Sequence, residues 1–242
     1  MDRFDIIQQI IEAKNSRNYL EIGVEKGKVF LKIKARKKIA VDPAFKIRLK
    51  KKIRACLANP MNLSNEYYEM TSDDFFEKHG DRLRRLNGLD IAFVDGLHTY
   101  GQTLKDIVNC LKFLAPGGVI AVHDCNPETA ASAVPAESRE QAADLNIHAQ
   151  TNDWSGDVWK AIVNLRSNRD DLKICVLDCD HGVAIITRGP SDSLLDLSSE
   201  KIEHLDFDDL NKNRKNLLNL KPPHYLHDFL RSTNDVLLEQ DD

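Results

Sequence analysis

The fold is decided by residues 19–27, which read Tyr19-Leu20-Glu21-Ile22-Gly23-Val24-Glu25-Lys26-Gly27. An apolar run that leads into glycines is typical of a buried strand followed by a tight loop. Glycine lets the backbone adopt positive φ and come close to a ligand. In the dinucleotide fingerprint G-x-G-x-x-G the middle glycine faces a pyrophosphate, but here Glu25 occupies that position. Because an anionic side chain disfavours a pyrophosphate, the loop predicts a ligand that lacks phosphates.

The same strand pattern recurs along the chain and alternates with stretches of helical periodicity. The apolar runs are residues 19–24, 39–41, 67–70, 89–94, 119–122, 174–177 and 183–186. Several are apolar at every position, as in strands covered on both faces. The turn between the last two is too short for a parallel crossover, so these strands are predicted to form an antiparallel pair. The sequence thus predicts an α/β fold with a doubly wound, mostly parallel seven-stranded sheet and an antiparallel edge pair.

Helices and less regular segments complete the predicted organisation. Helical periodicity covers residues 2–15, 104–114, 157–166, 207–220 and 224–231. Residues 125–153 form a long excursion after the fifth strand, where insertions are often functional. We expect one domain over residues 1–190 and a helical C-terminal extension over residues 191–242. That extension acts as a lid, packs on the domain or contacts a second subunit.

The composition excludes several classes of protein. With 42% hydrophobic and 30% charged residues the chain can bury a core and solvate its surface. No run approaches the roughly 18 to 20 apolar residues of a membrane span, and the first residues do not resemble a secretory signal. The net charge of −4 gives no reason to expect nucleic acid. Five cysteines without a CxxC pair favour free thiols, so we expect a cytoplasmic protein.

Polar side chains gather where the predicted strands end. In an open α/β sheet, ligands bind beyond the carboxyl ends of the strands. The residues there are Glu21 with Gly23 and Gly27, Asp42, Ser72-Asp73, Asp95-Gly96 and His123-Asp124. Core packing alone would not place a carboxylate at each of these five ends. The Asp42 carboxylate can accept both hydroxyls of a ribose; alternatively, it caps a helix that begins at Pro43.

With these clusters in view, the chain resembles the class I S-adenosylmethionine-dependent methyltransferases over about residues 15–190. Glu21-x-Gly23-x-x-x-Gly27 resembles their first motif and Asp42 their ribose-binding acid. Further segments resemble a bacterial subfamily of small-molecule methyltransferases associated with sugar and natural-product hydroxyls. These segments are Phe93-Val94-Asp95-Gly96-Leu97-His98-Thr99-Tyr100, Leu114-Ala115-Pro116-Gly117-Gly118-Val119-Ile120 and His123-Asp124.

The resemblance implies S-adenosylmethionine as cofactor and assigns residues to its parts. Glu21, Gly23, Val24 and Gly27 would line the methionine part, Asp42 would hold the ribose, Ser72 and Asp73 would lie at the adenine, and Asp95 would also contact the cofactor. The chain departs from the pattern at Lys28-Val29, where relatives usually carry a small hydroxyl residue.

The reaction is predicted to depend on residues that follow the fourth and fifth strands. Transfer of a methyl group to a hydroxyl requires an in-line arrangement and removal of a proton. Asp95, His98 and His123 are the candidate catalytic residues, with a histidine as the base. Alternatively, Asp95, His123 and Asp124 bind a divalent cation, Mg²⁺, Mn²⁺, Fe²⁺ or Zn²⁺, that lowers the pKa of the acceptor. In a third interpretation these residues are only structural.

Several rival functions remain open from the sequence. A non-catalytic binding module is favoured if Asp95 and His123 are buried and fully paired. A nicotinamide oxidoreductase is disfavoured by Glu25. A nucleic-acid or protein methyltransferase rests only on the basic segment 46–54, which is more simply a solvated helix. The preferred reading is methyl transfer to a small-molecule hydroxyl, with Trp154 and Asp157 near the acceptor, and the oligomeric state is left open.

Overall fold

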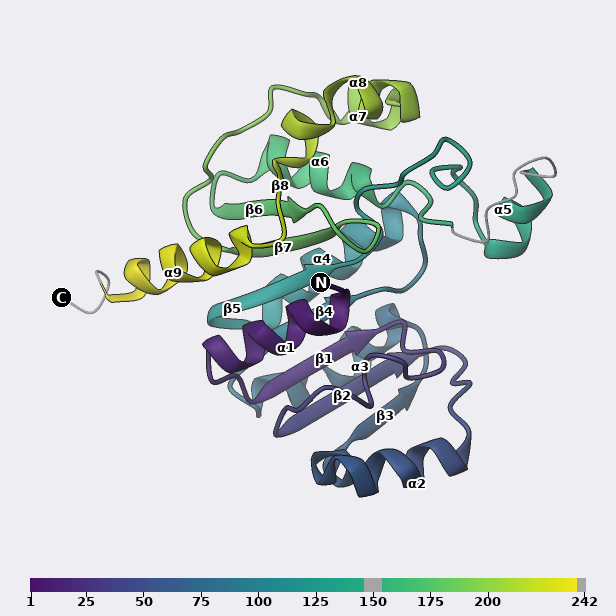
Figure 1. The fold of residues 1–242 in the computed structure, drawn as a ribbon, viewed down its shortest axis with the longest axis vertical. Helices are drawn as coiled ribbons and strands as arrows, with labels where there is room; N and C mark the ends of the chain where they lie inside the picture. The colour runs from purple at the N-terminus through teal and green to yellow at the C-terminus, as the bar shows by residue number, and fades with distance from the viewer. Residues whose placement is uncertain (146–153, 239–242) are drawn as a thin grey trace. The chain divides into compact units, whose positions relative to one another are not determined.

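The computed structural model describes residues 1–145 and 154–238 (Figure 1). Two compact units are distinguished by their internal contacts. The first comprises residues 1–96 and 106–121, and the second comprises residues 97–105 and the chain from residue 122 onward. Residues 146–153, part of the predicted excursion, lie outside the described residues.

The first unit is built on parallel strands. They are β1 (Asn18–Ile22), β2 (Lys37–Asp42), β3 (Glu66–Glu69), β4 (Leu89–Val94) and β5 (Leu114–Val122, its last residue in the second unit), in the order β3-β2-β1-β4-β5. β1 pairs in parallel with β2 and with β4, so Leu20 lies opposite Ile39 and Ala92. β1 and β2 are buried at every position but the first, as continuous apolar runs predict.

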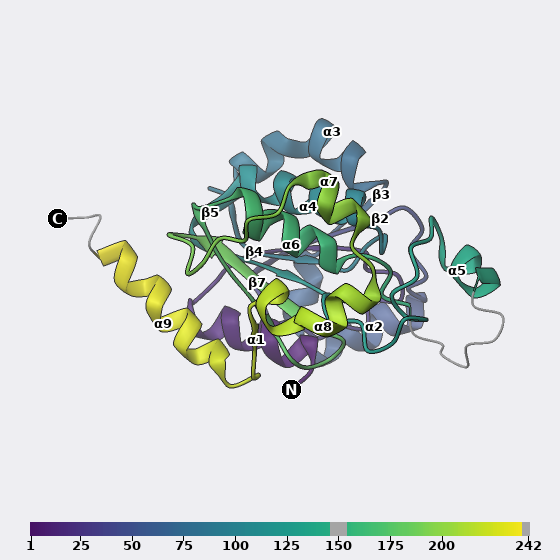
Figure 2. The same ribbon diagram turned by 90° about the horizontal axis from the view of Figure 1, so that it is seen from above.

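Helices cover both sides of these strands. They are α1 (Arg3–Ala13), α2 (Leu49–Ala58), the 3₁₀ helix η1 (Pro60–Ser64) and α3 (Ser72–Arg84). Figure 2 shows α1 and α2 on one side of β1–β3 and α3 on the other, which is the doubly wound arrangement. Asp2 caps α1 through a reciprocal capping box with Asp5, and Ile6, Ile7 and Ile10 are completely buried. α4 (Tyr100–Phe113) belongs to both units.

The second unit contains the predicted antiparallel pair. β6 (Leu172–Leu177) and β7 (Val183–Arg188) are antiparallel, with Leu177 opposite Val183 across the turn. β8 (Leu220–Lys221) adds to β6 in parallel and is an eighth strand beyond the seven predicted. The helices are α5 (Arg139–Leu145), α6 (Trp159–Asn168), α7 (Ser199–His204), α8 (Phe207–Leu218) and α9 (Tyr225–Leu238). The predicted boundary between residues 190 and 191 stays a prediction.

One element boundary differs from the sequence prediction. The sequence predicts a helix over residues 104–114 and a strand only from residue 119, whereas β5 already begins at Leu114. Gly118 explains the strand's course, because a Cβ there would lie 2.8 Å from the Leu89 carbonyl oxygen. The first residues of β5 are not buried, so the hydrophobic pattern detected only its apolar end.

The remaining expectations from composition concern cysteines and membrane spans. All five cysteines carry free thiols. Within the described ranges, no helix has both the length and the apolar character needed to cross a membrane.

Candidate functional site

The glycine loop after β1 lies against the end of β4. Gly23 has φ of +84°, and a Cβ at this position would lie 2.0 Å from the Asp95 carbonyl oxygen. The Gly23 amide donates to Val41 O at 3.0 Å, while the Asp95 amide donates to Ile22 O at 2.9 Å. Three strand ends therefore meet at one glycine, where only a residue without a side chain fits. Val24, predicted as the end of the strand, lies in the loop, and Gly27 (φ +61°) closes it.

Beneath the loop, Glu21 is enclosed by the protein. It is 2% exposed, and its Oε2 accepts a hydrogen bond from the Tyr19 hydroxyl at 2.5 Å. Burial raises the pKa of Glu21 to about 8, with Asp95 raising it further and Lys38 lowering it. Glu21 is therefore held inside the fold by Tyr19 and the Phe30 backbone, and its predicted place at the methionine part of the cofactor stays a prediction.

Lys38 is a second buried ionisable group below the same loop. Its Nζ donates to Phe30 O at 2.9 Å, to Ile33 O at 3.0 Å and to Asn62 Oδ1. Burial lowers the pKa of Lys38 to about 8. The lysine thus ties the irregular segment 24–35 to β2. Sequence analysis missed this residue because a lysine inside an apolar strand is more often a solvated one.

Asp42 ends β2 beside the glycine loop. Its Oδ2 accepts the Glu25 amide at 2.7 Å and its Oδ1 accepts the Ala44 amide at 2.8 Å. The alternative reading of Asp42 as a helix cap is wrong, because α2 begins only at Leu49. Each carboxylate oxygen accepts one backbone hydrogen bond here and has capacity for a further donor.

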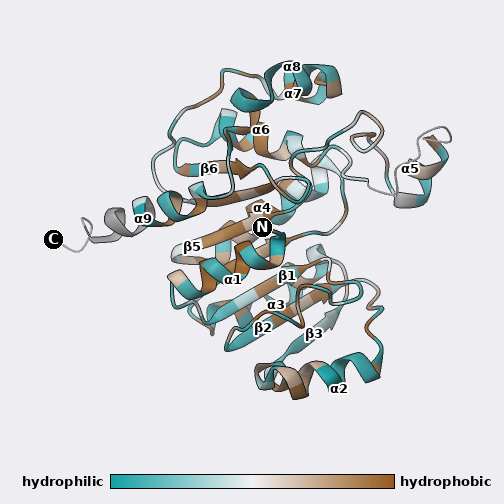
Figure 3. Cartoon of the chain, viewed as in Figure 1, coloured by the Kyte–Doolittle hydropathy of each residue, from teal (hydrophilic) through white to brown (hydrophobic). Residues whose placement is uncertain are grey.

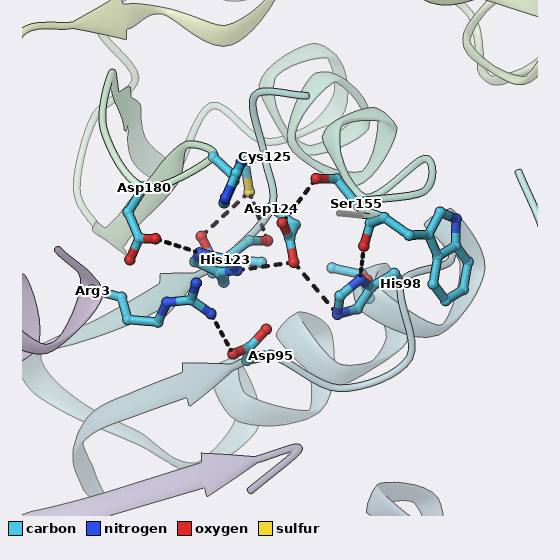
Figure 4. A network of polar contacts seen from close by, with 12 residues as sticks. Arg3, Asp95, His98, His123, Asp124, Cys125, Ser155 and Asp180 are labelled. Carbon is cyan, nitrogen blue, oxygen red and sulfur yellow. Dashed lines mark hydrogen bonds and ion pairs between the residues drawn. The ribbon is translucent and has the colours of Figure 1, made fainter. Parts of the chain in front are cut away.

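The other predicted cofactor residues also follow strands of the first unit. Ser72 is buried in the first turn of α3, after Thr71, which caps that helix through the Asp74 amide. Asp73 stands next to it. Asp95 follows β4, and its Oδ2 pairs with the guanidinium of Arg3 at 3.0 Å (Figure 4). Arg3 was not singled out from the sequence, since only the tertiary fold brings α1 to the end of β4.

A network of aspartate and histidine side chains lies in the second unit (Figure 4). Asp124 Oδ2 lies 2.9 Å from His123 Nδ1 and 3.4 Å from His98 Nε2, and its Oδ1 accepts the Ser155 hydroxyl at 2.8 Å. His123 Nε2 lies 3.6 Å from Asp180 Oδ1. The predicted residues His98, His123 and Asp124 are therefore brought together, whereas their grouping with Asp95, a residue of the first unit, stays a prediction.

Hydrogen bonding fixes the tautomer of His98. Its Nδ1 lies 2.6 Å from the carbonyl oxygen of Trp154, which can only accept, so Nδ1 must carry a proton. In the neutral ring the basic nitrogen is then Nε2, which faces Asp124. This contact is favourable when His98 is protonated or when a cation lies at Nε2 and the carboxylate.

His123 has a different environment. It is 3% exposed, and each of its ring nitrogens faces a carboxylate, Asp124 on one side and Asp180 on the other. Such a setting stabilises a positive imidazolium and holds the ring in place. It resembles the buried, paired arrangement that the non-catalytic rival requires, although the Asp95 side chain remains 18% exposed.

Asp180 was missed by the sequence analysis, which used the turn between β6 and β7 only to predict an antiparallel pair. Asp180 and His181 both have positive φ, of 47° and 60°. The turn is joined to the segment after β5 by the Cys125 amide donating to Gly182 O at 3.0 Å and the Asn126 amide donating to His181 O at 2.8 Å. The only sequence signal for Asp180 was its position in the turn Asp180-His181-Gly182.

The residues proposed near the acceptor have structural contacts. Trp154 stacks on His98 with ring centroids 5.2 Å apart, and its Nε1 donates to Val134 O at 2.8 Å. Asp157 Oδ1 accepts the Tyr100 amide at 2.6 Å at the start of α4. Trp159, at the start of α6, belongs to the core and is 1% exposed.

A glycine loop after the first strand and a carboxylate after the second, on parallel strands with helices on both sides, are typical of doubly wound α/β folds that bind ligands at the carboxyl ends of their strands. Residues 20–125 match the family model described as a methyltransferase domain. This match supports the predicted resemblance to the class I S-adenosylmethionine-dependent methyltransferases, and the predicted methyltransferase-like fold is confirmed.

Solved structures show the same fold. The O-methyltransferase from Bacillus cereus in complex with SAH shares 14% identity, with 77% of this chain and 80% of that chain covered and a TM-score of 0.54. The O-methyltransferase TomG from Streptomyces achromogenes, involved in tomaymycin synthesis and solved with SAM, shares 13% identity; the match covers 77% of this chain and 79% of that chain, with a TM-score of 0.53. The SAH-bound methyltransferase PaMTH1 from Podospora anserina shares 18% identity; the match covers 78% of this chain and 80% of that chain, with a TM-score of 0.50. A search of curated proteins finds no significant match.

Proposed function

We propose that this protein transfers a methyl group from S-adenosylmethionine to a hydroxyl of a small molecule, such as a sugar or another natural product. The observation that carries the proposal is the meeting of Gly23, Asp42 and Asp95 at three neighbouring strand ends of a methyltransferase domain. When bound there, S-adenosylmethionine supplies an electrophilic methyl group. The O-methyltransferases of similar fold support oxygen as the acceptor atom.

His98 is the residue best suited to take the acceptor proton. Its tautomer leaves the lone pair on Nε2, as a general base requires. His123 is less suited, since it is 3% exposed, whereas the side chain of His98 is 23% exposed. Asp124 orients the two rings and stabilises the imidazolium that forms. In this scheme the oxygen gains the methyl carbon, the carbon–sulfur bond breaks, and the proton passes to His98.

A divalent cation is an alternative source of acceptor activation. The donor set fits a cation, because carboxylate oxygens and imidazole nitrogens are ligands of Mg²⁺, Mn²⁺, Fe²⁺ and Zn²⁺. Asp95, His123 and Asp124 would hold it, and it would lower the pKa of the acceptor hydroxyl. The guanidinium of Arg3 pairs with the Asp95 carboxylate, so a cation at Asp95 would share this carboxylate with Arg3.

Cofactor binding is tested by calorimetric titration of the EDTA-treated protein with S-adenosylhomocysteine. We expect saturable binding by the wild-type protein and at least about a tenfold loss in Asp42→Asn, since the neutral amide is a weaker acceptor for ribose hydroxyls. Asp171→Asn, in an exposed pair with Arg169, is the matched control. Absence of binding by the wild-type protein would remove the proposal.

Measurements of methyl transfer distinguish His98 as the general base from a divalent cation that activates the acceptor. Using a panel of sugar and phenolic acceptors, we expect His98→Gln to lower kcat by about 10² to 10⁴ with little change in S-adenosylhomocysteine affinity. If instead EDTA abolishes turnover and one added cation restores it, the cation performs this role. The wild-type protein is better described as a non-catalytic binding module if it binds S-adenosylhomocysteine but methylates none of the acceptors, with or without metal.

A further inference from the structure

Helix α2 exposes its apolar residues. Leu49, Ile53 and Leu57 are 72%, 52% and 81% exposed. Their spacing of four residues places them on one face of the helix. α2 has no buried residue, although apolar stripes of surface helices normally face the core.

Polar contacts hold the other side of α2 to the protein. Lys51 Nζ donates to Lys26 O at 2.5 Å, and Lys52 Nζ lies 3.9 Å from the centroid of the Tyr67 ring. Asn62 Nδ2 also donates to Ala55 O at 2.9 Å. Two lysines and an asparagine therefore tie α2 to the protein, and its apolar stripe remains exposed.

The stripe continues into η1 and is surrounded by positive charge. Met61 and Leu63 are 45% and 78% exposed, so five of the nine exposed large hydrophobic residues in the described chain lie between residues 49 and 63. Residues 46–65 contain six basic and no acidic side chains, in a chain with a net charge of −4. The α2 patch is defined as Leu49, Ile53, Leu57, Met61 and Leu63 together with exposed Lys46, Arg48, Lys50 and Arg54.

We propose that the α2 patch binds an anionic lipid surface. A short helix with an apolar stripe and flanking Lys and Arg is suited to lie in the membrane interface, with apolar side chains among the acyl chains and cations at the phosphates. Figure 1 shows α2 beside β3, and Figure 3 shows that both hydrophobic and hydrophilic residues make up this helix. The charge of the patch is complementary to an acidic headgroup.

A second copy of the chain is a poorer occupant. An isologous contact would bring the same patch of both copies together and so oppose two basic clusters. An acidic protein would also be complementary to the charge of the patch. Binding to vesicles that contain no protein distinguishes a lipid partner from an acidic protein.

The test is sedimentation of the full chain with vesicles of phosphatidylcholine alone or with phosphatidylglycerol. We expect binding only to the anionic vesicles, weakened by salt. The double variant Leu49→Gln, Leu57→Gln and the double variant Lys50→Gln, Arg54→Gln should each reduce partitioning at least about tenfold. Leu194→Gln removes an equally large exposed leucine outside the patch (52% exposed) and should leave partitioning unchanged.

Three results would overturn the proposal. The first is no binding to anionic vesicles, which would favour an acidic protein as the partner. The second is binding that both double variants retain. The third is a wild-type dimer in light scattering that Leu49→Gln, Leu57→Gln converts to monomer, which would assign the patch to self-association. Thermal melting of each variant checks that the exposed substitutions leave the fold intact.

Discussion

At the scale of single residues, the unusual feature is the pair of buried ionisable groups under the glycine loop. Glu21 and Lys38 are 2% and 1% exposed and sit on adjacent strands. Burial disfavours the charged form of each, so the pKa of the acid is raised and that of the base is lowered, both to about 8. The protonation of this buried pair is therefore sensitive to pH.

We predict that Glu21 lowers stability as the pH rises. The folded protein keeps the Glu21 proton up to about pH 8, whereas the unfolded chain releases it near its ordinary pKa of 4.5, so the free energy of unfolding falls across this window. The Glu21→Gln substitution should remove that fall. The stability of the variant relative to the wild type should therefore rise by a few kcal/mol between about pH 5 and 7.5. Urea unfolding at the two pH values measures it.

The control for this measurement is Glu12→Gln at an exposed position of α1. Lys38 interferes little below pH 8: its lowered pKa raises stability only from about pH 8 upward, where the folded protein has already lost a proton that the unfolded chain still holds. Parallel pH profiles for wild type and Glu21→Gln would contradict the prediction.

At the scale of elements, strand ends are fixed by glycines that have no room for a side chain. Gly23 is the clearest case, since it combines positive φ with contact against β4. Gly182 plays a similar part in the β6–β7 turn, where a Cβ would lie 2.3 Å from Asn126 Cβ. These contacts set where Asp95 and Asp180 emerge from their elements.

Gly23→Ala is predicted to be strongly destabilising. The positive φ costs a non-glycine residue about 1 kcal/mol, and the clash with the Asp95 carbonyl forces the ends of β1 and β4 apart, for a total of about 3 kcal/mol or more. Chemical denaturation and S-adenosylhomocysteine titration measure the two consequences. Gly101→Ala in α4 is the control, because nothing lies within 4 Å of its Cβ position, and it should stabilise by about 0.5–1 kcal/mol. Equal effects of both substitutions would show that Gly23 is not constrained.

At the scale of the whole molecule, the C-terminal segment is integrated into the second unit. Leu210, Leu218 and Phe229 are completely buried or nearly so, and β8 pairs with β6. Arg166 of α6, 3% exposed, donates to the Asn216 and Leu217 carbonyl oxygens and to Ser193 Oγ. One buried guanidinium thus joins α6 to the end of α8 and to the segment after β7.

We predict that Arg166→Met destabilises the protein by about 2–4 kcal/mol, because several buried carbonyl groups lose their donor. Thermal and urea unfolding measure this loss. Arg169→Met is the control: its pair with Asp171 is more exposed, and the loss should stay below about 1 kcal/mol. If Arg166→Met is as mild as the control, the C-terminal segment is an appendage and not part of this core.

The sequence by itself determined the α/β class, the order of strands and helices, the antiparallel pair and the residues at strand ends, because periodicity and glycine positions are local signals. The cofactor residues that it predicts in the first unit, and the grouping of His98, His123 and Asp124 in the second, follow from those strand ends. It could not find Arg3, Lys38 or Asp180, since their roles depend on elements distant in the chain.

Only the tertiary structure decided which side of α2 faces the protein and which nitrogen of His98 is basic. The sequence of α2 is amphipathic whichever way it turns, and the Lys51, Lys52 and Asn62 contacts orient it with its apolar stripe outward. The proton of His98 is fixed by a carbonyl 56 residues away. Local patterns specify elements, whereas orientation and protonation are set by partners that folding brings together.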